Sequence, residues 1–299
     1  MPNTANTTMS ATVTLDAPQK QPGFFRRLLK SPSGVVGIVI IAFYLGVALA
    51  GAFELTPHSP LQQNRLDRLQ APSATYRMGT DLYGRDVLSR VIDGATNSLR
   101  VALASVLLSG VAGTLLGALS GFAGGLTDHV IMRVMDVFFA FPAILLALLV
   151  VVVLGPGLNN TILAIAVVYT PIFARVARGP TLSVREMDYV TAARCLGVSE
   201  RRILLLHVLP NILAPLIVQI SLALSWSLLT EAGLSFLGLG TRPPQASWGV
   251  MLSESRALAE IAPWLMLYPG LAIMLGVLGF NLLGDGLRDV LDPRLRGKR

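Results

Sequence analysis

Few residues of this chain are of the types that do covalent or metal chemistry. The 299 residues include 3 histidines and 1 cysteine. His58, His129 and His207 are scattered without the spacing of a metal-binding set, and the single Cys195 excludes a disulfide within the chain. Neither a phosphate-binding G-x-x-x-x-G-K-[ST] loop nor a dinucleotide-binding glycine fingerprint occurs. The sequence therefore predicts no enzyme, no catalytic residue, no metal site and no cofactor held by this chain.

Among the loops between the spans, the polar segment 178–205 tells most about function. Apolar residues recur here at positions i, i+3, i+4 and i+7: Tyr189, Ala192, Ala193 and Leu196. This spacing gives a short helix one apolar face. Gly197 follows, and glycine readily adopts the left-handed conformation that ends helices. A short helix outside a membrane cannot bury this face within itself. It packs either on the ends of this chain's own helices or in a groove of a soluble partner, and the residues leave both alternatives open.

A second group of motifs lies at 78–90. It contains Gly79-Thr80-Asp81 and, after two residues, Gly84-Arg85-Asp86. Asp, Gly and Thr suit tight turns, and we expect the Asp86 carboxylate to cap the first turn of a helix that starts near it. These residues predict an ordered external loop with internal salt bridges.

Small residues recur every four positions along one predicted helix, at Ser105, Ser109, Gly113, Gly117 and Gly121. Such a stripe lets another backbone approach closely, which is how helices associate inside a membrane. The stripe predicts helix packing, within this chain in preference to a seam between subunits.

The composition indicates that membrane-spanning helices position these motifs. The chain is 53% hydrophobic and only 14% charged, whereas soluble domains are about 25% charged. A spanning helix needs about 20 mostly apolar residues, and the uncharged stretches provide six. The sequence thus predicts an all-α integral membrane protein with spans at 34–53, 98–122, 133–154, 160–177, 208–232 and 265–285.

The spans divide the chain into three parts. Residues 1–22 are polar, without the apolar run of a secretory signal, and are expected to form a disordered cytoplasmic tail. Residues 23–96 provide the first span and an external loop. Residues 97–299 form the core transmembrane domain, which includes the cytoplasmic loop 178–205.

The distribution of basic residues predicts the orientation. With the N-terminus inside, 16 of the 24 Lys and Arg residues lie in cytoplasmic segments, as the positive-inside rule requires. Both termini are therefore expected in the cytoplasm, and the net charge of +7 needs no nucleic-acid partner. The two long external segments are 54–96 and 233–263. The second is broken by Gly and Pro, so it is expected to lie on the membrane or dip into it.

Charged residues near the spans bear on the energy source. They all lie close to predicted span ends, at Arg100, Arg133, Asp136, Arg175, Glu231 and Asp285. Ion-driven carriers place such groups at membrane depth. Their absence there, together with a helix suited to a partner, suggests a transporter subunit driven by a separate ATPase.

The loop now has a parallel in a known family. It resembles the cytoplasmic signature of the membrane permease subunits of binding-protein-dependent ABC importers, which reads E-A-A, three residues, G, nine residues, an aliphatic residue, any residue, L-P. The matching residues are Thr191-Ala192-Ala193, Gly197 and Leu209-Pro210. Thr191 replaces the frequent Glu, and His207 replaces the aliphatic residue. The resemblance implies that this loop is the coupling helix, which docks in a cleft of an ATPase subunit.

Further motifs resemble the dipeptide/oligopeptide/nickel group of these permeases, and within it the second, C-type subunit. They are Gly79-Thr80-Asp81, Gly84-Arg85-Asp86, the segment Leu234 to Gly240, and Asp292-Pro293-Arg294. The resemblance implies a multi-pass protein of the cell inner membrane, surrounded by lipid. It also implies a second homologous permease, two subunits that bind ATP and Mg, and an external solute-binding protein.

The expected substrate is a di- or oligopeptide, and nickel and glutathione-like solutes remain open. Two other classes compete with this reading. A stand-alone secondary carrier or channel would transport alone, and a structural or assembly protein would have no transport path. Neither explains the signature and spacing of the cytoplasmic loop.

Overall fold

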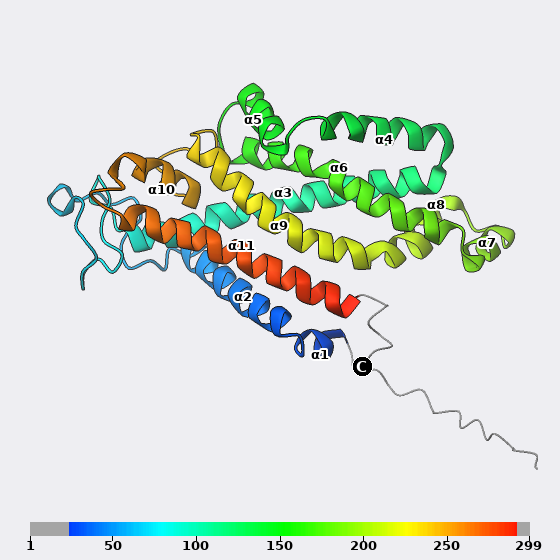
Figure 1. The fold of residues 1–299 in the computed structure, drawn as a ribbon, viewed down its shortest axis with the longest axis horizontal. Helices are drawn as coiled ribbons and strands as arrows, with labels where there is room; N and C mark the ends of the chain where they lie inside the picture. Colours follow the sequence, from blue (N-terminus) through cyan, green and yellow to red (C-terminus); the bar gives the residue numbers. More distant parts are fainter. Residues whose placement is uncertain (1–23, 292–299) are drawn as a thin grey trace, which may run out of the picture.

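The computed structural model describes residues 24–291, which are all-helical apart from loops and one isolated bridge between Thr80 and Asp86. The predicted tail 1–22 and the C-terminal Asp292-Pro293-Arg294 lie outside the described residues. The helices run mostly along one long axis (Figure 1).

Five long helices form the frame: α2 (Pro32–Ala52), α3 (Val87–Ala123), α6 (Leu158–Arg185), α9 (Leu213–Phe236) and α11 (Trp264–Leu291). The shorter helices are α1 (Phe24–Leu28), α4 (Gly125–Phe139), α5 (Ala143–Leu154), α7 (Asp188–Cys195), α8 (Glu200–Ile203) and α10 (Trp248–Ser255). The remaining helical turns are a π-helical turn, η2 (Leu204–Val208), and the 3₁₀ turns η1 (Arg65–Asp67), η3 (Leu209–Ile212) and η4 (Arg256–Leu258).

The prediction of a polytopic all-α membrane protein is confirmed. Within residues 24–291, 5 helices are long and apolar enough to cross a membrane, and the count is 6 if the bent pair of α4 and α5 forms one span. Large apolar side chains remain exposed along these helices, among them Phe43, Leu107, Val153 and Trp226. A surface of this kind suits lipid or a neighbouring membrane subunit.

The third predicted span, 133–154, is wrong as one straight helix. α4 and α5 meet at an angle of 92° across the break at 140–142. Pro142 precedes α5 as its N-cap residue. Proline has no backbone N–H and disfavours helical conformation in the residue before it, here Phe141. The predicted break between the third and fourth spans is present, since Gly155 and Gly157 have φ of +87° and +146° between α5 and α6.

The fifth predicted span, 208–232, begins irregularly. The chain passes from α8 through η2 and η3 before the regular helix α9 starts at Leu213. Pro210 lies in η3, and a proline cannot donate the backbone hydrogen bond that continues an α-helix. The second and fourth spans are longer than predicted, because α3 starts at Val87 and α6 continues to Arg185. Polar residues mark the edge of a membrane without ending a helix.

The interior is built on two helix pairings. α3 packs along α6, and α11 packs against both α2 and α9. Buried residues at these contacts are often small, such as Ala95, Ala102, Ala177 and Ala223. Close approach of small residues replaces the hydrophobic gain that is missing between helices in lipid.

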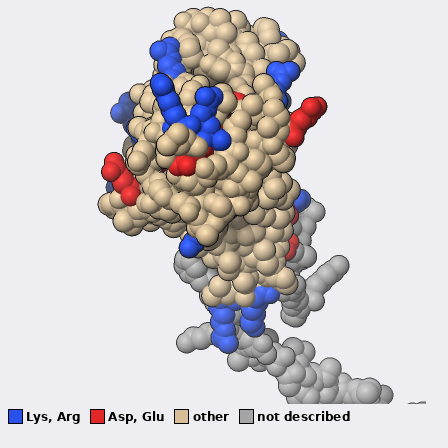
Figure 2. All heavy atoms as spheres, turned by 90° about the vertical axis from the view of Figure 1, so that its left-hand side faces the viewer, with Lys and Arg blue, Asp and Glu red and all other residues tan. Residues whose placement is uncertain are grey.

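Predicted cytoplasmic and external segments lie at opposite ends of the molecule. α1, the C-terminal end of α11, α7 and α8 share one end, while the loop 54–86 and α10 form the other (Figure 1). Figure 2 looks onto this second end, where Lys and Arg side chains and a few Asp and Glu are spread over a mostly uncharged surface. The arrangement agrees with the predicted sidedness.

Candidate functional site

The cytoplasmic helix predicted from residue spacing is α7, at the end of the molecule beside α8 (Figure 1). Val190 and Ala193 are buried in the main hydrophobic core. Met187, Tyr189 and Leu196 stay exposed, Leu196 by 83%. One side of α7 therefore packs on this chain, and another side remains exposed.

Gly197 ends α7 in the left-handed conformation that the sequence predicts, with φ of +77°. Its N–H donates to the carbonyl oxygen of Arg194 at 2.9 Å, and the N–H of Val198 donates to that of Ala193 at 3.1 Å. This pair of bonds is the Schellman C-cap. A Cβ at Gly197 would meet no atom within 4 Å. The requirement for glycine is therefore conformational and not steric.

The other signature residues divide between surface and core. Thr191, Ala192 and Pro210 are exposed, whereas Leu209 packs against the core. Asn211, which sequence reasoning missed, joins the two halves of the signature. Its Nδ2 donates to the Tyr189 hydroxyl at 3.2 Å and to the His207 carbonyl oxygen at 2.6 Å. Its position directly after the Leu209-Pro210 pair is the only sequence signal for it.

Two arginines make the polar contacts that hold this end of the molecule together. The guanidinium of Arg194 binds both carboxylate oxygens of Glu200, at 3.0 and 3.3 Å. Arg185, at the end of α6, donates to the carbonyl oxygen of Gly121 in α3 at 2.8 Å. These contacts connect α7 with α8 and the preceding helix α6 with α3.

At the opposite end, the turn at 79–86 needs its glycines. Gly79 and Gly84 have φ of +76° and +73°, and a Cβ at Gly84 would overlap the carbonyl oxygen of Asn64. Asp86 caps α3 as predicted, because its carboxylate accepts the N–H of Ser89 at 2.9 Å. The cap of α3 is local, whereas the need for glycine at position 84 also comes from its contact with Asn64.

Side chains of the turn hold the rest of the external loop. The Thr80 hydroxyl accepts the N–H of Gln70 at 2.9 Å. The carboxylate of Asp81 accepts the N–H groups of Tyr83 and Arg85 at 2.8 and 2.9 Å. Nearby, a hydrogen bond to Asp67 raises the pKa of the Tyr76 hydroxyl. Only the protonated hydroxyl can donate this bond to the Asp67 carboxylate, so the bond favours the protonated form. The loop is thus ordered by many hydrogen bonds.

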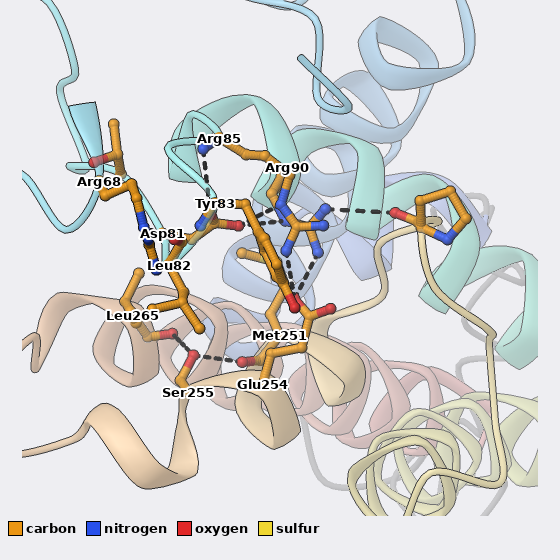
Figure 3. Close-up of polar contacts among 12 residues, drawn as sticks. Arg68, Asp81, Leu82, Tyr83, Arg85, Arg90, Met251, Glu254, Ser255 and Leu265 are labelled. Atoms are coloured by element: carbon orange, nitrogen blue, oxygen red, sulfur yellow. Dashed lines mark hydrogen bonds and ion pairs between the residues drawn. The ribbon is translucent and has the colours of Figure 1, made fainter. Parts of the chain in front are cut away.

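A buried ion cluster connects this turn to α10 (Figure 3). Arg85 binds Asp81, and Glu254 of α10 accepts from Arg85 at 2.9 Å and from Arg90 at 3.0 Å. The side chains of Arg85 and Arg90 are only 4% and 1% exposed. We call Asp81, Arg85, Arg90 and Glu254 the external ion cluster.

The predicted salt bridges inside the loop are therefore only part of the arrangement. Arg85 and Glu254 are 169 residues apart in the chain, and Glu254 was not among the predicted site residues. Buried charges in proteins are paired, because an unpaired one loses its hydration without compensation. The cluster matches two arginines with two carboxylates and fixes the external loop to α10.

Glu231 lies near the end of its span, as the sequence predicts, but it is also buried, which the sequence does not show. This residue lies in the last two turns of α9 and is 0% exposed. Its carboxylate accepts the Ser235 hydroxyl at 2.7 Å. Hydropathy patterns missed it because they register position along a helix and not which side of the helix is covered.

The stripe of small residues on α3 faces α6. A Cβ at Gly113 or Gly117 would overlap the carbonyl oxygen of Thr170 or Ala174, and one at Gly121 would lie 2.9 Å from that of Arg178. The Ser105 hydroxyl instead meets that of Ser227 in α9 at 2.7 Å. Within this chain the stripe therefore serves close helix packing.

Comparison with known families gives two matches. Residues 113–297 match the family described as "Binding-protein-dependent transport system inner membrane component". Residues 23–72 match "N-terminal TM domain of oligopeptide transport permease C". The first match covers more than half of the chain and includes α7, Gly197 and the Leu209-Pro210 pair.

Similar curated proteins extend over nearly the whole chain. The dipeptide transport system permease protein DppC of Alkalihalophilus pseudofirmus is 44% identical over 272 residues, covering 91% of this chain and 89% of the relative. The glutathione transport system permease protein GsiD of Pectobacterium atrosepticum is 42% identical, with 91% of each chain covered. The probable D,D-dipeptide transport system permease protein DdpC of Escherichia coli is also 42% identical, covering 94% of this chain and 96% of the relative.

A solved structure shares the fold. It is the MetNI methionine ABC transporter in inward-facing conformations, with a TM-score of 0.54 and 19% identity. The match covers 66% of this chain and 94% of that one.

Proposed function

The chain belongs to the family of binding-protein-dependent transport system inner membrane components, and we propose that it is one of two permease subunits of an ATP-driven importer of di- or oligopeptides. The family match over residues 113–297 carries the proposal, because it includes the coupling signature and the last four of the six predicted spans in full. Peptide as the cargo rests on similarity to permeases named for dipeptides, at 44% and 42% identity. Glutathione, in the name of another relative, is itself a peptide-like solute.

The exposed side of α7 is the proposed contact with the ATPase subunit. Tyr189, Leu196 and Met187 are apolar and 41%, 83% and 46% exposed, at an end of the molecule where lipid is not expected to cover them. Apolar side chains grouped in this way mark a protein interface. ATP and Mg would be held by the two ATPase subunits, one on each permease.

Movement of α7 has a defined route to the spans. Val190 and Ala193 are packed into the core, and Asn211 and Arg185 tie the same end to η2 and to α3. When nucleotide draws the ATPase subunits together, a rigidly attached α7 moves with them. The populations of inward-facing and outward-facing states then shift with nucleotide and with the docked binding protein.

The external ion cluster supports a second contact. Because Arg85, Arg90 and Glu254 fix the loop 54–86 to α10, this end presents a rigid surface on which an external binding protein would dock. The exposed apolar faces of α3 and α9, which include Leu107 and Trp226, are available to the second permease and to lipid.

Uptake of radiolabelled L-alanyl-L-alanine tests the function. A strain that lacks this chain should lose uptake, and the wild-type gene on a plasmid should restore it. Uptake that is unchanged by the deletion would overturn the proposal, as would uptake by this chain alone in proteoliposomes without ATPase subunits.

Gly197→Val tests the coupling role in the complemented strain. A β-branched residue in the left-handed region is strained by about 1–2 kcal/mol, so the C-terminus of α7 should change shape. We expect normal membrane levels, at least a tenfold loss of uptake, and loss of ATPase stimulation by the binding protein. Gly197→Asn is the matched control, since Asn tolerates this conformation. Full transport-linked ATPase activity in Gly197→Val would contradict the assignment.

A further inference from the structure

The external end carries a trough to which none of the functions above assigns a role. A hollow of about 440 Å³ is lined by side chains of Asn97, Arg100, Asn159, Asn160 and Gln245, with Gly157 and Leu158. A hollow of about 810 Å³ shares Asn97, Arg100 and Gln245 with it and continues past the end of α2 along residues 54–61. We call the two together the outer trough.

One end of the outer trough offers hydrogen-bond donors and no carboxylate. The Arg100 guanidinium forms no hydrogen bond or ion pair with any residue from 24 to 291, and the side-chain amides of Asn159 and Gln245 also have no partner in that range. An arginine fork binds a carboxylate through two parallel hydrogen bonds. This end is therefore suited to a carboxylate group.

The other end has the opposite charge. Glu54 and Asp93 line the larger hollow, and neither carboxylate forms an ion pair within the described part of the chain. Carboxylates without a cationic partner attract an ammonium group. The Asp93 carboxylate accepts a hydrogen bond from the Ala246 backbone, but among residues 24–291 Arg100, Glu54 and Asp93 form no ion pair with one another.

The external ion cluster shows how this chain treats charges that serve structure. There, Arg85 and Arg90 are paired with Asp81 and Glu254 and are almost fully buried. Arg100, Glu54 and Asp93 are arranged differently, since they line an open hollow and none of the three forms an ion pair with residues 24–291. A solute that carries both a carboxylate and an ammonium group would satisfy both ends at once.

Resting on the proposed function, we propose that the outer trough binds the charged termini of the peptide cargo, the carboxylate at Arg100 and the ammonium group at Asp93 and Glu54. The hollows fall within the range of about 300–1,000 Å³ that small-molecule sites occupy. The wall of the larger hollow is mainly polar, and Asn97 and Gln245 line both hollows together with Arg100. Recognition of the two termini alone accommodates different side chains, which suits an importer of varied peptides.

Uptake of three solutes by the complemented deletion strain tests the two ends of the trough separately. The solutes are L-alanyl-L-alanine, its C-terminal amide, and its N-acetyl derivative. Arg100→Gln should lower the uptake ratio of the free dipeptide to the amide about tenfold, because the wild type binds the terminal carboxylate and the variant does not. A double variant, Glu54→Gln with Asp93→Asn, should lower the ratio of the free to the acetylated dipeptide by a similar factor. Each variant should leave the other ratio unchanged.

Arg65→Gln is the matched control, since Arg65 is an exposed external arginine that does not line the trough. Immunoblots of membranes verify equal protein levels. Ratios that stay at wild-type values in the trough variants overturn the inference. So does an equal loss of all three solutes in Arg100→Gln, which would assign the arginine to a lipid headgroup or to assembly. A wild type that takes up no dipeptide at all would instead overturn the proposed function.

Discussion

Glu254 is the side chain through which the external loop is held to α10. It is the carboxylate that accepts from both Arg85 and Arg90, and its own side chain is 29% exposed while theirs are nearly inaccessible. Removing one member of a buried ion cluster leaves the others desolvated and unpaired. The contribution of Glu254 is therefore best measured by keeping its shape and removing its charge.

Glu254→Gln should free the turn at 79–86 from α10. We expect the variant to lower the free energy of opening of this segment by about 3 kcal/mol, seen as faster hydrogen exchange at residues 79–86 in detergent-purified protein. Glu260→Gln, at an exposed carboxylate, is the control and should exchange like wild type. Equal protection of the turn in both variants would show that the cluster does not hold it.

Local residue chemistry was predictable and distant pairing was not. The Asp86 cap and the left-handed Gly197 depend on a few neighbouring residues, and both are present as the sequence predicts. Glu254, Asn211 and the buried Glu231 depend on contacts with other elements. No spacing rule along the chain reports those contacts.

At the scale of elements, the close pairing of α3 with α6 depends on glycines, which have no side chain. Gly117 and Gly113 sit where a Cβ would overlap backbone oxygens of α6. Two helices at this distance gain dispersion contacts along their length, which is the main source of helix association in lipid. The serine and glycine stripe is thus a requirement of packing.

Gly117→Ala should separate these helices. Overpacking of a close contact destabilises by about 1–3 kcal/mol, so we expect a lower thermal unfolding midpoint in detergent. Gly46→Ala in α2 is the control, because a Cβ there meets no atom within 4 Å and alanine is the better helix former. An unchanged midpoint for Gly117→Ala would mean that α3 and α6 adjust without loss.

The boundaries of elements were the weakest part of the sequence prediction. The uncharged run 137–174 contains Pro142 as well as the Gly-Pro-Gly turn at 155–157, and the predicted spans are separated only at the turn. The 92° bend before α5 arises from a missing backbone hydrogen bond, which hydropathy does not measure. Predictions from apolar length therefore located the spans but not their shape.

For the whole molecule, sidedness follows from which segments share an end. α7 lies with α1 and the end of α11, opposite the external loop (Figure 1), and the excess of basic residues predicts that the α7 end is cytoplasmic. The single cysteine of the chain, Cys195, is exposed on α7. It provides a natural probe of orientation.

A membrane-impermeant maleimide should label Cys195 in inside-out vesicles and not in intact spheroplasts. Tyr83→Cys in a Cys195→Ser background is the control, because Tyr83 is 47% exposed at the opposite end and should show the reverse pattern. Labelling of Cys195 from outside would invert the topology. In the assembled transporter, we expect a docked ATPase subunit to slow the labelling of Cys195 at least tenfold.

The sequence by itself determined the class of protein, its spans, its expected sidedness and the local motifs, because hydropathy, charge distribution and turn chemistry are properties of short segments. Tertiary structure decided what those segments meet. It bent the third span, buried one side of α7 while leaving another exposed, and paired Glu254 with two distant arginines. In the outer trough it left Arg100 without an ion pair among residues 24–291. Such features depend on contacts between residues far apart in the chain, and only the folded backbone brings those residues together.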